Sequence, residues 1–182
     1  MSDQFRVRFA ERMNQLPPYL FGMINKMKME KRWQGLDVID LGMGNPIDPA
    51  PGPVTDKLCE VATDPKSHRY PIAGGMKNLK REIGLYYARN YNVPLNGEND
   101  VICTIGSKEG ISHMCLALLG PGDTVLVPAP AFPIHVYAAV IAGANVLRIQ
   151  LSTEDEFLSQ VVGMCKSLYP GPKLLMLNYP HN

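Results

Sequence analysis

The stretch DVICTIGSKEGISHMCLALLGPGDTVLVPAP, residues 100–130, decides the fold of this 182-residue chain. Residues 101–105 are rich in β-branched side chains, which predicts a short strand that is buried on both faces. After Gly106, apolar side chains recur at helical spacing, which predicts an amphipathic helix with the stripe Ile111, Met114, Cys115, Leu118 and Leu119. A Pro-Gly turn then precedes a second predicted strand over residues 124–127. The stretch is therefore predicted to fold as strand, helix and strand.

The first turn of that helix, Gly106-Ser107-Lys108, has the residue types of an anion site. The first backbone N–H groups of a helix have no partner within the helix, and the helix dipole is positive there. A small residue lets an anion approach closely, and the hydroxyl of Ser107 adds a donor. The turn therefore predicts a phosphate site. The local residues leave a second interpretation open, in which Ser107 only caps a helix that binds nothing.

The composition is that of a globular protein, with 46% hydrophobic residues, 19% charged residues and a net charge of +1. This balance gives no indication of nucleic acid or an anionic membrane surface as a partner. No apolar run approaches the roughly 20 residues that cross a bilayer, and the charged N-terminus does not resemble a secretory signal. A cytoplasmic protein is therefore predicted.

The cysteines show no close pairing and mostly fall inside apolar segments, so they are predicted to be reduced core thiols: Cys59, Cys103, Cys115 and Cys165. The four histidines have no metal-ligand spacing with these cysteines, so no metal site is predicted.

The N-terminal part is predicted to form an arm over residues 1–15, followed by a helix that opens at Pro17-Pro18 and frays from Lys28. A strand over residues 36–41 is predicted to run into Gly42-Met43-Gly44. This G-x-G is not a dinucleotide fingerprint, because it lacks the third glycine and the helix that must follow directly. The glycines are interpreted instead as exposing backbone N–H groups to a ligand or a neighbouring loop.

Helices are predicted over residues 53–62 and 76–91, the second of which carries Tyr86 and Tyr87 as core or boundary residues. The rest of the chain predicts a helix over 134–142 that ends at Gly143, a strand over 145–151 and a strand over 173–177. Between those strands, a helix is predicted to begin with a capping box formed by Thr153 and Glu156.

From residue 101 onward, strands and helices alternate, which predicts the α/β class with a doubly wound, mostly parallel sheet. An N-terminal helical arm with part of a small domain, residues 1–52, is predicted to precede the first part of a large domain, residues 53–182. In such sheets ligands bind beyond the carboxyl ends of the strands. Three segments are expected to converge at that edge: residues 106–108, 130–133 and 178–182.

Five segments, in order, resemble the pyridoxal-phosphate aminotransferases of fold type I, class I/II, in the branch of the alanine and LL-diaminopimelate aminotransferases. They are LPPYLFGMINKMK, DVIDLGMGNP, RYPIAGGMKNLK, TIGSKEGISHMCLALLGPGDTVLVPAPAFP and LNYPHN, and they span residues 16–182. The resemblance implies pyridoxal 5′-phosphate as cofactor, an amino acid and a 2-oxo acid as substrates, and a homodimer.

The resemblance also implies roles for individual residues. Ser107 and Lys108 correspond to the phosphate-binding turn, and Phe132 to the aromatic residue that stacks on the pyridine ring. Asn182 corresponds to the asparagine that hydrogen-bonds the phenolic oxygen of the cofactor. Tyr70 corresponds to the tyrosine that reaches the phosphate in the neighbouring subunit.

Gly44 resembles the glycine whose backbone lines the pocket for the substrate carboxylate. Lys108 is not expected to form the Schiff base, because it corresponds to the phosphate end of the cofactor. In the family the Schiff-base lysine lies beyond the part that these 182 residues match, so no catalytic residue is assigned. The chain is accordingly expected to be an N-terminal portion that cannot transaminate alone, with exposed apolar surface and poor solubility.

Two other functions remain open at this point. Another fold type I enzyme, such as a carbon–sulfur lyase or a decarboxylase, would use the same cofactor site. An aminotransferase-like domain could instead serve as a ligand-sensing module in a regulator, although residues 1–35 show no helix-turn-helix or basic stripe.

Overall fold

The computed structural model describes residues 8–42, 44 and 46–180, and the chain divides into two compact units. Unit 1 contains residues 1–19 and 105–182, and unit 2 contains residues 20–104. α2 and α3, which the predicted boundary after residue 52 assigns to the large domain, lie in unit 2. The domain boundary of the sequence analysis stays a prediction.

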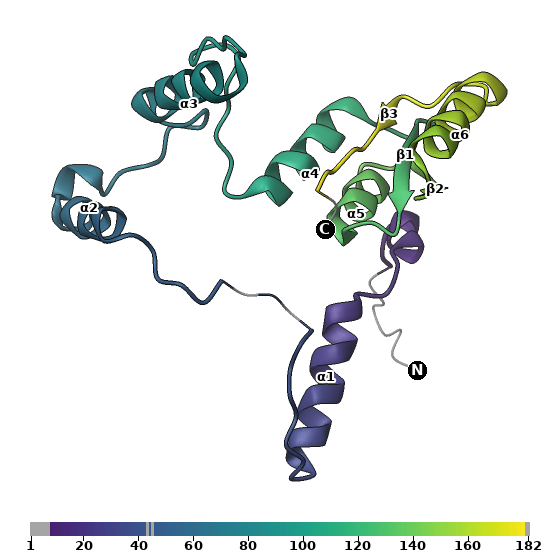
Figure 1. Cartoon of the computed structure of the whole chain (residues 1–182), viewed down its shortest axis with the longest axis horizontal. Coiled ribbons are helices and arrows are strands. Elements are labelled where there is room, and N and C mark those ends of the chain that lie inside the picture. The colour runs from purple at the N-terminus through teal and green to yellow at the C-terminus, as the bar shows by residue number, and fades with distance from the viewer. Residues whose placement is uncertain (1–7, 43, 45, 181–182) are drawn as a thin grey trace, which may run out of the picture. The chain divides into compact units, whose positions relative to one another are not determined.

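Unit 1 is built on a three-stranded parallel sheet with the order β2-β1-β3 (Figure 1). In the register, Val125 of β1 pairs with Val146 of β2 on one side and with Leu174 of β3 on the other. The elements of this unit are η1 (Glu11–Gln15), α4 (Ser107–Leu118), β1 (Thr124–Ala129), α5 (Pro133–Ile141), β2 (Asn145–Gln150), α6 (Glu154–Ser167) and β3 (Leu174–Leu175). The parallel α/β class that was predicted is confirmed.

The two faces of the sheet carry separate apolar clusters. Successive side chains of a strand point to opposite faces, and Val125 and Val127 of β1 pack in one cluster with α4 and α5. Leu126 lies in the other cluster with Phe157 of α6. The chain moves from β1 to β2 on one side and then returns past β1 to β3, so right-handed crossovers would put α5 and α6 on opposite faces. The two clusters agree with this doubly wound arrangement.

Helix α5 ends as the sequence predicts, at a glycine. The Gly143 N–H donates to Val140 O at 2.9 Å, and the Ala144 N–H donates to Ala139 O at 3.0 Å. This is the Schellman pattern, and it requires a left-handed residue, which Gly143 supplies with φ of +87°. The turn leads the chain directly into β2 (Asn145–Gln150).

Unit 2 is helical over the part of the chain that the structure describes. Its elements are α1 (Leu20–Trp33), α2 (Gly52–Thr63), η2 (Pro65–Ser67) and α3 (Lys77–Tyr91). The positions of α2 and α3 agree with the predicted helices. α1 begins later than predicted and continues past Lys28 to Trp33, so the predicted fraying there is wrong.

Two predicted strands are not formed. Residues 36–41 and 101–105 have no strand assignment. A strand is stabilised by the ladder it makes with its neighbours, and a β-rich segment without a sheet beside it stays irregular. The described residues of unit 2 form no sheet that these segments could join. Local sequence could not reveal that missing neighbour.

Several side chains are more exposed than predicted. Cys115 is buried, and burial raises the pKa of its thiol, but Cys59 and Cys165 are exposed rather than core residues.

Thr153 precedes α6 without a side-chain capping bond, so the predicted capping box is absent at this helix. Tyr86 and Tyr87 lie at the surface, where they pack edge-on against each other with ring centroids 6.0 Å apart.

Candidate functional site

Helix α4 begins in a conformation that suits its predicted role. Gly106 precedes the helix with φ of +86° and ψ of 155°, a region that is essentially restricted to glycine. The first hydrogen bond of the helix runs from the Gly110 N–H to Gly106 O at 3.5 Å, so the amides of Ser107 and Lys108 come before it. Both residues are exposed. These amides are available to bind an anion from solvent.

Glu109 is a member of this turn that the sequence analysis missed. Its carboxylate accepts a hydrogen bond from the Ile105 N–H, and it lies 4.0 Å from His113 Nδ1. A carboxylate in the first turn is favourable toward the helix dipole and caps the backbone just before the helix. The sequence carried only part of this signal, because Glu109 stands three residues after the N-cap as in a capping box, but the N-cap is Gly106 and not the Ser or Thr that the box requires.

Phe132 lies in the loop between β1 and α5, directly before Pro133. Its ring is partly buried, and the centroid lies 6.0 Å from that of His135, which is itself 7% exposed. The ammonium of Lys108 lies 5.0 Å from the centroid of the Phe132 ring. The structure therefore brings together two of the three segments that were expected to converge, residues 106–108 and 130–133.

The third segment follows β3. Because β3 is parallel to β1, residue 178 leaves the sheet at the same edge as the Phe132 loop. The Asn178 side-chain amide donates to Pro180 O at 3.3 Å and helps to shape this turn. Asn182, the predicted partner of the phenolic oxygen, lies outside the described residues.

The two remaining predicted site residues belong to unit 2. Tyr70 lies in the loop between η2 and α3 and is 99% exposed. Gly44 is exposed in the segment that leads from α1 to α2. The functional roles of all six predicted residues stay predictions.

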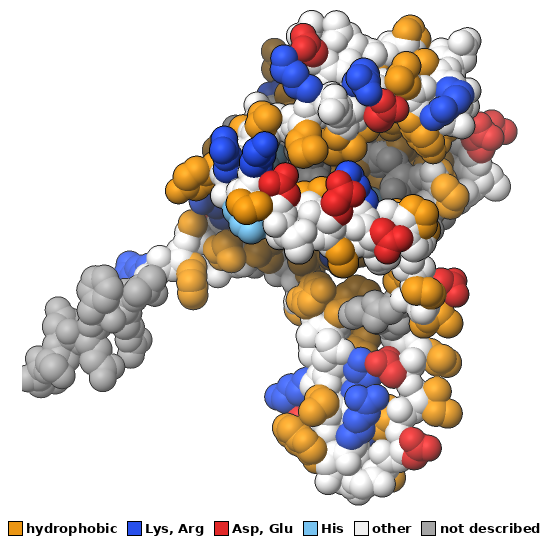
Figure 2. All heavy atoms as spheres, turned by 90° about the vertical axis from the view of Figure 1, so that its left-hand side faces the viewer, with side chains coloured by type: hydrophobic (Ala, Val, Ile, Leu, Met, Phe, Trp, Pro, Cys, Tyr) orange, Lys and Arg blue, Asp and Glu red, His pale blue; other side chains and the backbone are white. Residues whose placement is uncertain are grey.

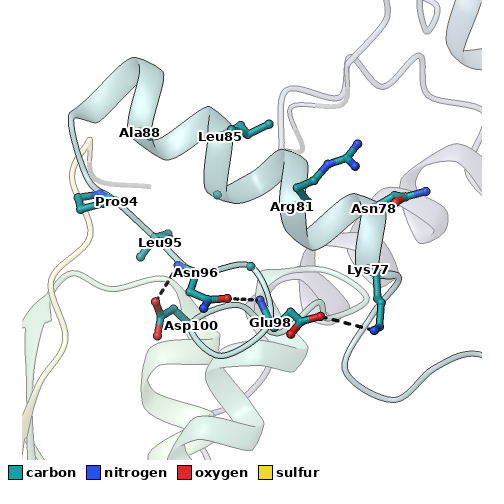
Figure 3. Close-up of a pocket in the computed structure, with 12 residues that line it drawn as sticks. Lys77, Asn78, Arg81, Leu85, Ala88, Pro94, Leu95, Asn96, Glu98 and Asp100 are labelled. Carbon is teal, nitrogen blue, oxygen red and sulfur yellow. Dashed lines mark hydrogen bonds and ion pairs between the residues drawn. The ribbon is translucent and has the colours of Figure 1, made fainter.

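A separate groove of about 790 Å³ lies between α3 and the segment 94–100 (Figure 3). None of the predicted site residues that the structure describes lines it. In Figure 3, Lys77 pairs with Glu98 across one end, and the Asn96 N–H donates to Asp100 at 2.8 Å. The groove is open, and its lining carries both positive and negative side chains. It therefore does not gather charge of one sign that would bind a charged ligand.

The described part of the chain carries neither a candidate metal cluster nor a helix that could cross a membrane. No group of three or more His, Cys, Asp or Glu side chains there could hold a metal ion. Among the same residues, no helix has both the length and the apolar character that a bilayer span requires.

Comparison with known proteins gives consistent results. The family model described as aminotransferase class I and II matches residues 36–182. The glutamate–pyruvate aminotransferase AlaC of Escherichia coli (strain K12) is 42% identical over 182 residues, which are 100% of this chain and 44% of that protein. An LL-diaminopimelate aminotransferase of Aquifex aeolicus (strain VF5) is 38% identical over 96% of this chain and 45% of its own length.

Among solved structures, substrate-bound BacF from Bacillus subtilis is similar, with a TM-score of 0.85 and 29% identity over 97% of this chain and 45% of that one. The chain thus spans less than half the length of these relatives. The family match covers more than half of the chain and includes the α4 turn, the Phe132 loop and the three-stranded sheet. The chain belongs to the aminotransferase class I and II family.

Proposed function

We propose that this chain supplies the phosphate and ring-face parts of a pyridoxal 5′-phosphate site in an enzyme that moves an amino group from an amino acid to a 2-oxo acid. The observation that carries the proposal is the contact between Lys108 and Phe132 at the carboxyl edge of a parallel sheet, where Lys108 Nζ lies 5.0 Å from the centroid of the Phe132 ring. A helix N-terminus beside an aromatic ring offers one surface for a phosphate and another for a flat ring.

The donor set fits this cofactor. The first-turn amides, the Ser107 hydroxyl and the Lys108 ammonium are the groups that bind a phosphate dianion. A Cβ at Gly106 would meet nothing within 4 Å, so the space beside this glycine is open. When bound, the cofactor supplies an electron sink for the bond that breaks at the substrate Cα.

Each residue then has a task that its chemistry supports. Ser107 and Lys108 would hold the phosphate, and the apolar ring of Phe132 would cover the pyridine ring and exclude water from it. Asn182, which lies outside the described residues, would hold the phenolic oxygen, as the family resemblance implies. Gly44 offers its backbone to the substrate carboxylate. The high exposure of Tyr70 supports a role in which a second subunit covers it, in a cytoplasmic homodimer.

Cofactor binding by the chain itself tests the first part of the proposal. Ser107→Ala and Lys108→Gln should each weaken the binding of pyridoxal phosphate about tenfold but should leave the binding of pyridoxal, which has no phosphate, unchanged. Phe132→Ala should weaken both ligands. Lys166→Gln on the exposed part of α6 serves as the matched control. Equal affinity for the two ligands in the wild-type chain would contradict the proposal.

A chimaera tests the activity, in which this chain replaces the matched 44% of AlaC. We expect it to transfer the amino group of L-glutamate to pyruvate, whereas the 182-residue chain alone should show no transfer. Decarboxylation or carbon–sulfur cleavage by the chimaera would favour a different reaction at the same site. Cofactor binding without turnover would favour a sensing module.

A further inference from the structure

One carboxylate in unit 2 joins helix α1 to the glycine segment that follows it. Asp40 Oδ2 lies 2.6 Å from Lys28 Nζ, and Asp40 Oδ1 accepts a hydrogen bond from the Gly42 N–H at 3.0 Å. The position that a Cβ would take at Gly42 lies 3.5 Å from Ile24 Cγ2 of α1, so the backbone runs against the helix surface. We call Lys28, Asp40 and Gly42 the α1 clip.

The α1 clip is more sheltered from water than the other charged pairs of this unit. The side chains of Lys28 and Asp40 are 17% and 32% exposed, whereas those of Lys57 and Glu60 are 66% and 69% exposed at the same 2.6 Å separation. Water and salt therefore screen the clip less than an ordinary surface pair. The hydrogen bond from Lys28, followed by that from the Gly42 N–H, lowers the pKa of Asp40 below its usual value.

The α1 clip lies close to Gly44 in the chain, which bears on the entropy that this segment loses when it binds a ligand. Glycine has more backbone freedom than any other residue, so a Gly-x-Gly segment loses much entropy when it is fixed around a ligand. A contact that fixes the segment beforehand removes part of this loss from the binding step. The clip fixes the backbone two residues before Gly44.

We propose that Asp40, held by Lys28, is a positioning residue that orders the backbone of Gly42 and Gly44 for the substrate carboxylate. The part of this inference that concerns substrate rests on the proposed function, because it takes Gly44 as the lining of the carboxylate pocket. The ordering of the backbone does not depend on that function and can be measured in the 182-residue chain.

Amide exchange in this chain tests the ordering. Asp40→Ala should speed the exchange of the Gly42 and Gly44 amides about tenfold at pH 7, because it removes both the ion pair with Lys28 and the acceptor of the Gly42 N–H. Asp40→Asn keeps an acceptor for the Gly42 N–H, and Lys28→Met keeps the carboxylate, so both should have smaller effects. Glu60→Gln breaks the matched exposed pair and should change neither amide.

A pH profile separates this role from a general loss of stability. The charged groups that act on Asp40 are Lys28 and Arg32 of α1. The amide proton shift of Gly42 should follow the titration of Asp40 and step at a pH below about 3.9, its unperturbed value. Asp40→Asn should abolish the step, and Lys28→Met should move it to higher pH. A Gly42 shift without this step, or exchange in Asp40→Ala that matches Glu60→Gln, would overturn the proposal.

The chimaera with AlaC tests the link to substrate. There, Asp40→Ala should raise the KM for L-glutamate about tenfold while kcat and the affinity for pyridoxal phosphate stay unchanged. A KM equal to that of the Glu60→Gln control would show that the clip does not position the pocket. An inactive chimaera would count against the proposed function, whereas the exchange experiment would still decide the ordering role.

Discussion

At the scale of single residues, two glycines that both have room for a Cβ should respond to substitution by alanine with opposite changes in stability. A Cβ would meet nothing within 4 Å at either Gly106 or Gly163. Gly106 has φ of +86°, so Gly106→Ala should lower the free energy of unfolding by about 1–3 kcal/mol through backbone strain alone. Gly163 lies inside α6, so Gly163→Ala should raise it by about 0.5–1 kcal/mol. Urea unfolding of the two variants measures both values.

The same experiment bears on the phosphate site. If Gly106→Ala leaves the free energy of unfolding unchanged, Gly106 does not adopt a positive φ before α4. Weaker binding of pyridoxal phosphate in Gly106→Ala, with normal binding in Gly163→Ala, would connect the conformation of Gly106 to the proposed role of the turn.

Asp123 makes the stability of unit 1 depend on pH. It accepts hydrogen bonds from Lys173 Nζ and the Gly120 N–H, each at 2.9 Å, and the bond from Lys173 is the main cause of its lowered pKa. A carboxyl group whose pKa is lower in the folded state stabilises above its unfolded value of about 3.9 and loses this effect as the pH falls through its folded value.

A variant without the Asp123 carboxylate should therefore differ in stability from the wild type only at higher pH. Asp123→Asn should lower the urea midpoint at pH 7 and should flatten the fall in midpoint below about pH 4. Glu82→Gln, which removes the exposed Arg81–Glu82 pair within α3, is the control and should leave both features in place. An unchanged acid dependence in Asp123→Asn would mean that other groups cause it.

At the scale of elements, β1 is the centre of unit 1. Leu126 is 1% exposed and packs with Ile149 and Phe157 on the α6 face of the sheet. Leu126→Ala should lower the free energy of unfolding by about 2–5 kcal/mol, because it leaves a cavity in a packed core. Leu116→Ala in α4, where the side chain is 52% exposed, should change it by about 0.5 kcal/mol or less. Denaturant unfolding followed by circular dichroism measures both.

The elements also show where local sequence is a sufficient guide. The helix over residues 76–91 and the end of α5 at Gly143 were predictable because helical spacing and a glycine cap are local signals. The α4 stripe was only partly right. Cys115 and Leu119 are buried in the cluster with β1 and α5, whereas Met114 and Leu118 are 45% and 49% exposed, so α4 buries a narrower surface than the stripe provides.

At the scale of the whole molecule, the amount of exposed apolar surface leads to a prediction about association. Hydrophobic side chains lie beside charged ones on the surface view, including those of α1 at the bottom of Figure 2. Leu20, Met27 and Trp33 of that helix are 58%, 61% and 78% exposed. Surfaces of this kind favour association. The chain should bind a hydrophobic dye and should sediment as species larger than a monomer as its concentration rises.

The variant Met27→Lys/Trp33→Gln tests whether α1 takes part in this association. It should bind less dye and shift the sedimentation profile toward the monomer. Lys57→Gln on α2 is the control, because it changes an exposed charge without removing apolar surface. A wild-type chain that stays monomeric and binds no dye would contradict the prediction.

The sequence by itself determined the α/β class, the order of elements from α4 onward and the residues of the candidate phosphate turn. These depend on periodicity, β-branched runs and glycine positions, which act over a few residues. Only the tertiary structure decided that Lys108 lies over Phe132, that Asp40 ties Gly42 to α1, and that residues 36–41 and 101–105 form no strand. The physical reason is that side-chain contacts and strand pairing need partners far along the chain. No local pattern specifies which distant residue lies beside a given side chain or strand.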